Sequence, residues 1–252
     1  MLEPNELKEG FKPIKNEPPA TVIKKIKFYG RMILDLQILT IYTDIKKEFP
    51  YYKGKVLDIG CGQSPYKYLL NKMETEYKGI DVAEASDFDY INKDITFFDG
   101  KNIPFDNNTF DAIICTEVLE HVYEHQHLVD EIYRVSKPGA KGIITIPFSA
   151  RYHYIPHDFY RYTPSALERI FGKFSKIEII PRGTDVLSIC AKIIVLFYRN
   201  MLPDNIIKII FLPFWIAILP VLGITVLVAH ISRIFNLGSD LDPLGYTVKI
   251  VK

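Results

Sequence analysis

A ten-residue stretch, Val56 to Pro65, constrains the fold of this chain more than any other. It reads VLDIGCGQSP, in which an aliphatic run from Val56 to Ile59 precedes two glycines. Such a run predicts a buried strand, and Gly60 and Gly62 allow the backbone to turn sharply beside a ligand. Pro65 suits the first turn of a helix, because it has no N–H to leave unpaired. Strand, glycine loop and helix together predict a nucleotide crevice at the carboxyl end of a parallel sheet.

Acidic residues near this loop indicate which nucleotide it would take. The dinucleotide fingerprint requires a third glycine where this chain has Pro65. Asp58 lies two residues before the first glycine, where a carboxylate suits a cationic amino group better than a pyrophosphate. A second predicted strand, Tyr77–Asp81, ends in an acid about 20 residues downstream, the spacing at which a carboxylate binds ribose hydroxyls. These features fit S-adenosylmethionine (SAM), whose methionine end carries an amino group.

Three further segments follow in a fixed order: residues 103–111 (IPFDNNTFD), 115–122 (CTEVLEHV) and 136–140 (SKPGA). Together with the glycine loop they resemble the class I SAM-dependent methyltransferases, specifically the methyltransferase type 11 group. Ala140 replaces the second glycine of the family's last segment. Because chance would have to satisfy all four segments in order, the resemblance is far more specific than a lone glycine loop.

The resemblance implies a set of contacts to SAM. The backbone of the glycine loop would approach the methionine part, Asp58 would hold its amino group, and Asp81 would take both ribose hydroxyls. The adenine would meet an acid after the third strand. We favour Asp94 by its distance from Asp81, with Asp99 as the alternative or as an ordinary turn residue. The predicted cofactor-binding residues are Asp58, Gly60, Cys61, Gly62, Asp81, Val82, Asp94, Ile95 and Thr116.

A crowded segment after the predicted fifth strand is the candidate acceptor site. Residues 151–164 (RYHYIPHDFYRYTP) bring together aromatics, two histidines, an acid and two arginines. Methyl transfer is an in-line displacement, and a hydroxyl acceptor also requires a general base. We favour His157 as that base, with Asp158 and Arg161 orienting it or the substrate; the alternative is that His157 and Asp158 only cap the next helix. A similar PHD-x-Y-R-x-T segment occurs in family members found with surface-polysaccharide genes, which implies a hydroxyl on a glycan- or lipid-linked acceptor.

Glu117, Glu120 and His121 form a rival site at i, i+3 and i+4 of a predicted helix. This Glu-x-x-Glu-His pattern resembles metal-dependent methyltransferases that act on RNA 2′-hydroxyls and on quinone precursors, and His153 or His157 would complete a magnesium or manganese site. Most type 11 members with this segment are not known for a metal, so no metal is predicted. The alternative functions are a metal-assisted RNA or quinone O-methyltransferase, and a non-catalytic SAM-binding scaffold associated with a membrane.

The alternation of strands and helices predicts an α/β fold, a Rossmann-like doubly wound sheet of seven mostly parallel strands. Residues 49–186 would form the core, and 241–252 its closing strand, which enters antiparallel between strands five and six. Residues 1–48 would form an N-terminal arm and a cap helix, or a basic membrane-surface helix. Helices are also predicted over Pro65–Lys72 and Leu119–Val135. The predicted strands are Val56–Ile59, Tyr77–Asp81, Tyr90–Asp94, Asp111–Cys115, Gly142–Ile146, Phe174–Ile180 and Gly245–Val251.

Residues 187–240 are predicted to be an apolar helical insertion. From Ile209 to Ser232 no Asp, Glu, Lys or Arg occurs, a run long enough for a transmembrane helix. Pro213 and Pro220 would break a straight span, and strands six and seven must share one sheet. We therefore expect a re-entrant hairpin or interfacial helices, with Leu187–Leu202 as partner and basic residues suited to an anionic leaflet. The alternatives are a dimer interface or an enlarged core.

Composition limits the remaining possibilities. The formal net charge is +1, from 31 basic and 30 acidic residues, which gives no long-range field for DNA. The three cysteines, Cys61, Cys115 and Cys190, form no CxxC pair and fit reduced thiols. The first residues lack the apolar region of a secretory signal. We therefore expect a cytoplasmic protein, peripheral or monotopic on the cytoplasmic membrane face, with a small-molecule or lipid- or glycan-linked acceptor.

Overall fold

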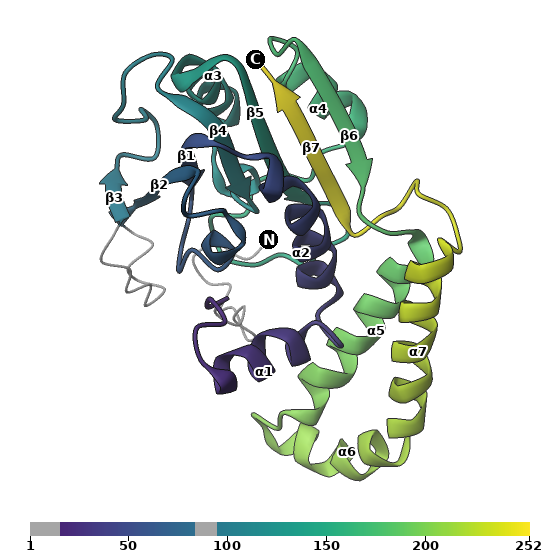
Figure 1. Cartoon of the computed structure of the whole chain (residues 1–252). Coiled ribbons are helices and arrows are strands. Elements are labelled where there is room, and N and C mark those ends of the chain that lie inside the picture. Colours follow the sequence, from purple (N-terminus) through teal and green to yellow (C-terminus); the bar gives the residue numbers. More distant parts are fainter. Residues whose placement is uncertain (1–15, 84–94) are drawn as a thin grey trace.

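The computed structural model describes residues 16–83 and 95–252. Its centre is a seven-stranded sheet in the order β3-β2-β1-β4-β5-β7-β6 (Figure 1). Neighbouring strands from β3 to β5 pair in parallel, whereas β7 lies antiparallel between β5 and β6. The predicted Rossmann-like fold is confirmed. The strands are β1 (Gly54–Ile59), β2 (Thr75–Val82), β3 (Ile95–Phe98), β4 (Phe110–Thr116), β5 (Ser136–Pro147), β6 (Lys176–Pro181) and β7 (Gly245–Val251).

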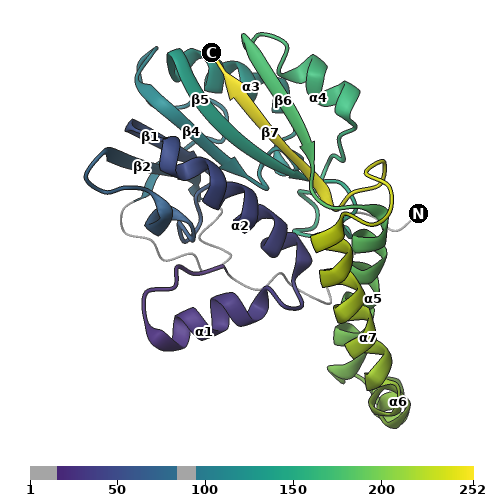
Figure 2. The ribbon, with the colours of Figure 1, turned by 45° about the vertical axis from the view of Figure 1, so that its right-hand side comes forward.

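Helices cover both faces of this sheet (Figures 1 and 2). α3 (His125–Val135) and α4 (Pro164–Ile170) contribute to the hydrophobic core on one face. α1 (Val22–Arg31) and α2 (Leu36–Glu48) contribute to the core on the other. Three short 3-10 turns, η2 (Phe49–Tyr51), η3 (Lys67–Leu69) and η5 (Leu119–His121), join these elements, and α5 (Asp185–Met201), α6 (Ile206–Ala217) and α7 (Leu219–Phe235) form a separate projection.

The two cores follow from the twofold side-chain alternation of the central strands. In β4, Ile113 and Cys115 belong to the core under α3, whereas Ala112 and Ile114 belong to the core under α2. A strand segment buried on both faces must be apolar at every position, which is why Ala112–Cys115 in the middle of β4 is a continuous apolar run. Asp58 is the exception in β1, since it is only 6% exposed. A buried carboxyl in such a strand marks a site.

Several predicted helices are wrong in extent. The predicted helix over Pro65–Lys72 is only the 3-10 turn η3, because Ser64 adopts a left-handed φ of 51° and Leu70 is already extended. The predicted helix over Leu119–Val135 is divided into η5 and α3, because Val122 has extended backbone. The predicted cap over residues 21–48 is two helices, α1 and α2. The predicted strand Tyr90–Asp94 lies outside the described residues, and β3 begins directly after it.

The apolar insertion leaves the sheet at its carboxyl edge. α5 follows β6 and α7 leads into β7, so both ends of the insertion lie at the edge where the parallel strands end (Figure 2). Within residues 16–83 and 95–252, no single helix is long and apolar enough to cross a membrane. α6 and α7 pass that test only as a pair, bent by 64° between them.

Candidate active site

The glycine loop has the geometry of a ligand-binding turn. Gly60 and Gly62 have positive φ of 63° and 47°, a region in which side chains are strained. A Cβ atom at Gly60 would collide with the side chain of Val118. The end of β2 holds the loop, because Gly60 donates to the Ile80 carbonyl at 2.9 Å and Gly62 donates to Asp81 Oδ2 at 2.8 Å. These two hydrogen bonds fix the glycine loop against the end of β2.

Two buried carboxyls flank this loop. The Tyr77 hydroxyl donates to Asp58 Oδ2 at 2.6 Å and lies 2.8 Å from Ser64 Oγ. Burial raises the pKa of Asp58 to about 7, although the hydrogen bond from Tyr77 lowers it. Burial also raises the pKa of Asp81, against the backbone hydrogen bonds from Gly62 and Val82. Buried carboxyls with raised pKa values beside bare backbone fit a ligand that brings both a cation and hydroxyls.

Of the other predicted cofactor residues, Cys61, Val82 and Thr116 lie at the carboxyl edge of the sheet, whereas Ile95 lies beside Gly79 at the amino end of β3. The prediction that Ile95 follows the third strand is therefore wrong, and the acid directly after β3 is Asp99. Cys61 is buried, and burial raises the pKa of its thiol, so it is inert packing beside Gly79. Val82 and Thr116 end β2 and β4, and Ile95 begins β3. Asp94 lies outside the described residues. Asp99 is exposed, and its carboxylate accepts hydrogen bonds from Lys101 and Asn102, so it closes its own turn.

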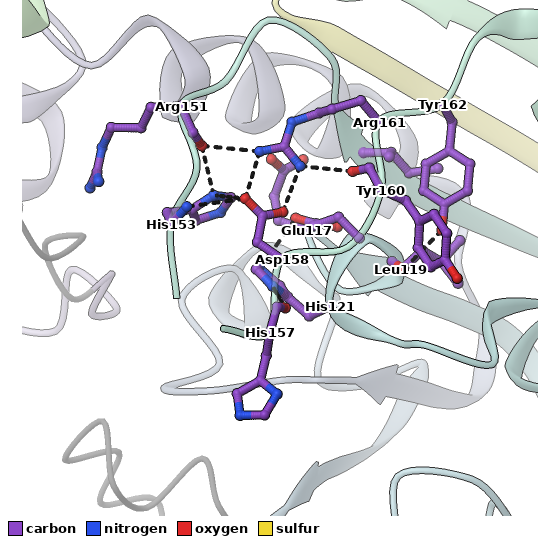
Figure 3. Close-up of polar contacts among 12 residues, drawn as sticks. Glu117, Leu119, His121, Arg151, His153, His157, Asp158, Tyr160, Arg161 and Tyr162 are labelled. Carbon is purple, nitrogen blue, oxygen red and sulfur yellow. Dashed lines mark hydrogen bonds and ion pairs between the residues drawn. The ribbon is translucent and has the colours of Figure 1, made fainter. Parts of the chain in front are cut away.

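Asp158 is the centre of the acceptor region (Figure 3). Its side chain is 1% exposed and accepts two hydrogen bonds from Arg161, at 2.5 and 2.7 Å. His153 Nδ1 lies 2.9 Å from Asp158 Oδ2. Burial favours the protonated form of Asp158, but the hydrogen bonds from Arg161 and the positive charges outweigh it and lower its pKa. The predicted pairing of Asp158 with Arg161 is thus present, with His153 as its third member.

The His157 side chain lies apart from this group. Its ring is exposed and points away from Asp158 (Figure 3), while its carbonyl oxygen lies 2.6 Å from His121 Nδ1. The sequence identified the correct segment for a histidine partner of Asp158, but the loop brings His153 rather than His157 to it. The use of His157 as a general base stays a prediction.

Glu120, His121 and His153 together form a candidate metal site. One ligand atom from each lies within 4.8 Å of the others. The Glu120 side chain is 0% exposed, and neither of its carboxylate oxygens has a hydrogen-bond partner among the described residues. Burying such a group unpaired is costly, and burial raises its pKa well above the ordinary value. A cation between the three side chains would remove that cost.

Both histidines are oriented as metal ligands are. His121 Nδ1 faces the His157 carbonyl, and His153 Nδ1 faces the Arg151 carbonyl at 3.0 Å and Asp158. Acceptors on these nitrogens place the proton on Nδ1 and leave the Nε2 lone pairs free. Burial lowers the pKa of His121 to about 4, so its ring is neutral near pH 7. Two imidazoles and one carboxylate suit a divalent transition cation.

Glu117 does not join this group. It adopts a left-handed φ of 53°, so the predicted helical face of Glu117, Glu120 and His121 is wrong. Its carboxylate accepts instead from Arg182 Nη2 at 2.8 Å. Arg182 is fully buried, and its Nε and Nη1 have no partner in the described part of the chain. Sequence analysis missed Arg182; the available signal was an arginine directly after an apolar strand.

This fold and site define a class of protein: an α/β domain whose glycine loop and two buried carboxyls have the geometry suited to a nucleoside that carries an amino acid. Residues 57–144 match the family described as Methyltransferase domain. A ubiquinone biosynthesis O-methyltransferase of Coxiella burnetii is 29% identical over 144 residues, which cover 52% of this chain and 55% of that protein. The chain spans about half the length of the curated relatives it matches.

Solved structures share the fold. A SAM-dependent methyltransferase from Archaeoglobus fulgidus superposes with a TM-score of 0.52 at 17% identity, covering 90% of this chain and 99% of that one. The phosphoethanolamine N-methyltransferase 2 of Haemonchus contortus, in complex with SAM, gives a TM-score of 0.51 at 18% identity, covering 83% and 51%. Residues 57–144 of this chain thus carry a methyltransferase domain of the type 11 family, an enzyme class whose cofactor is SAM.

Proposed function

We propose that this protein transfers the methyl group of SAM to a hydroxyl on a glycan- or lipid-linked acceptor, with a divalent cation at Glu120, His121 and His153. The observation that supports this most is the buried Glu120 carboxylate, which has no partner other than the two histidines beside it. The cluster of Glu120, His121 and His153 adjoins the predicted cofactor loop. Gly60 of that loop packs against the side chain of Val118, which lies two residues before Glu120. The relative in ubiquinone biosynthesis is itself an O-methyltransferase.

Each residue of the site then has a distinct task. SAM supplies an activated methyl group, and a divalent cation lowers the pKa of a hydroxyl that binds to it. The glycine loop and Asp81 hold the cofactor. Asp158 fixes the tautomer and the direction of His153, and Arg161 holds Asp158 ionised through two hydrogen bonds. Arg182 keeps Glu117 directed away from the cation.

The test is methyl transfer from tritiated SAM to a membrane-lipid extract of the source cells, before and after chelation. We expect transfer to stop with chelator and to return with Mn²⁺ or Mg²⁺. S-adenosylhomocysteine formation that chelator leaves unchanged would contradict the metal. SAM binding without any methyl transfer would contradict the enzymatic function itself.

Alanine substitutions of the two loop histidines, made one at a time, distinguish a mechanism that uses a metal from one that uses a histidine as general base. His153→Ala removes a ligand and is expected to reduce transfer roughly hundredfold or more. His157→Ala keeps the backbone carbonyl that orients His121, so it should change the rate only a few-fold at most. The measurement is the initial rate of each variant at saturating Mn²⁺. A larger loss of rate in His157→Ala than in His153→Ala would favour His157 as the general base.

Binding of SAM should depend on pH through Asp58. Its pKa of about 7 means that much of it is protonated below neutral pH, whereas a cationic amino group binds the carboxylate. The dissociation constant of SAM should therefore rise roughly tenfold for each pH unit below that value and level off above it. Asp58→Asn should bind weakly at every pH, without this slope. Calorimetry across the pH range measures both, and a flat wild-type profile would exclude Asp58 as the amino-group partner.

A further inference from the structure

The helix α6 is almost entirely apolar and yet mostly exposed, because only Lys208, Leu212 and Trp215 are half-buried. Not one of its residues is buried in the fold. A helix without a polar face is ordinarily found inside a protein or in a membrane, since water does not stabilise it. The exposed apolar side chains of α6 and α7, each at least half exposed, include Ile206, Ile207, Ile209, Ile210, Phe211, Phe214, Ile216, Ile224 and Leu227.

The hairpin that carries α6 is built as a rigid projection. α5 and α7 run side by side and bury Leu187, Ile194 and Ala229 against Leu36 of α2. α6 crosses between their far ends, at the tip (Figures 1 and 2). Because α6 and α7 are bent by 64° and both ends of the hairpin return to the sheet, an apolar phase around α6 would leave both ends on the same side.

A second, basic surface lies on α1. It exposes Val22, Ile23 and Ile26 together with Lys25 and Lys27, and with Lys24, which pairs with Glu17 at 2.9 Å. Apolar and basic side chains on one exposed helix are typical of helices that lie at the headgroup level of an anionic membrane. His230 Nε2 of α7 lies 3.0 Å from the Ile33 carbonyl, so α7 contacts the turn that follows α1.

We infer that this surface docks on an anionic lipid bilayer, with α6 and the start of α7 in the acyl region and α1 among the headgroups. The basic helix favours a lipid occupant over a second copy, because anionic headgroups complement the exposed lysines of α1, whereas a second copy brings the same positive charge to the contact. The parallel strands end on the same side as α1 and the hairpin (Figures 1 and 2). The crevice then faces the bilayer, and a lipid-linked acceptor reaches it from there; this last step rests on the proposed function.

Vesicle flotation tests the surface without any turnover. The probe is phosphatidylcholine vesicles with about a quarter phosphatidylglycerol, compared with phosphatidylcholine alone. The variant Ile210→Glu/Phe211→Glu places two charges on α6. The matched control, Tyr51→Glu/Met73→Glu, places two charges at apolar positions on the core domain that are at least as exposed as the two α6 positions. Since all four side chains are exposed, the fold should be retained, and SAM binding by each variant checks it.

Wild type and control should float, and the α6 variant should lose roughly a hundredfold in vesicle partitioning. Replacing Lys24, Lys25 and Lys27 by glutamine should remove only the preference for anionic vesicles. Wild type that stays in the lipid-free fraction, or an α6 variant that floats as wild type does, would overturn the inference. A dimer in solution that the α6 variant dissociates, without vesicle binding, would assign the surface to a second copy. Flotation with failed methyl transfer would leave docking intact and contradict only the proposed function.

Discussion

Glu120→Gln is expected to abolish cation binding and reduce methyl transfer by about 10²-fold or more, while making the metal-free protein more stable. The two effects have one cause. Glu120 is fully buried with both carboxylate oxygens unpartnered, which costs folding free energy in the absence of a cation. A neutral amide of the same size removes the cost of ionising a buried carboxyl, so the metal-free variant should be more stable wherever Glu120 would lose its proton. A residue that serves only the fold would not behave in this way.

The matched control is Glu131→Gln, because Glu131 is also buried but satisfied. Arg134 donates to its carboxylate at 2.7 Å, and the Ile103 N–H donates at 2.9 Å. The hydrogen bonds lower the pKa of Glu131, whereas burial raises that of Glu120. Denaturant unfolding in chelator should therefore show a loss of about 1 to 3 kcal/mol for Glu131→Gln, and calorimetry should show unchanged Mn²⁺ binding. A Glu120→Gln protein that still binds Mn²⁺ as wild type does would refute the cation site.

Asp81→Ala is expected to weaken SAM binding by about 10² to 10³-fold. Asp81 acts twice, because its carboxylate accepts from the Gly62 N–H and so fixes the glycine loop, and it is the predicted partner of both ribose hydroxyls. Alanine removes both contributions, whereas asparagine keeps an acceptor for Gly62 and should lose less. Titration calorimetry with SAM measures the difference.

Asp99→Ala is the control for this loss. Asp99 is the other acid considered for the cofactor, but its carboxylate closes an exposed turn with Lys101 and Asn102. We expect its SAM affinity to remain within a few-fold of wild type. Equal losses of SAM affinity in Asp81→Ala and Asp99→Ala would mean that both acids affect binding only through the stability of the fold. That result would contradict the assignment of Asp81 to the ribose hydroxyls.

Local sequence patterns were sufficient for most of the sheet. Aliphatic runs define β1 and β4, the glycines after β1 require positive φ, and Gly245–Val251 forms β7 over the predicted residues. These features depend only on neighbouring residues and on the alternation between two buried faces. β3 was missed, because it begins at Ile95, directly after the strand predicted over Tyr90–Asp94.

The acceptor site depends on contacts that no local pattern contains. His153 and His157 are four residues apart in one aromatic loop, and only the path of that loop decides which ring meets Asp158. Glu120 and His121 meet His153 across more than thirty residues of chain, on a 3-10 turn rather than on the predicted helix. Arg182, directly after β6, reaches Glu117, directly after β4, across the two strands that lie between them in the sheet. Such pairings arise from tertiary packing and override helix propensity.

The central claim is that the crevice of Gly60, Asp58 and Asp81 binds SAM. Calorimetric titration of SAM into detergent-solubilised wild-type protein at pH 8, above the pKa of Asp58, tests it most directly. We predict saturable binding of one molecule per chain, which Asp81→Ala removes. A wild-type protein that unfolds cooperatively, and is therefore folded, yet takes up no SAM would contradict the cofactor assignment.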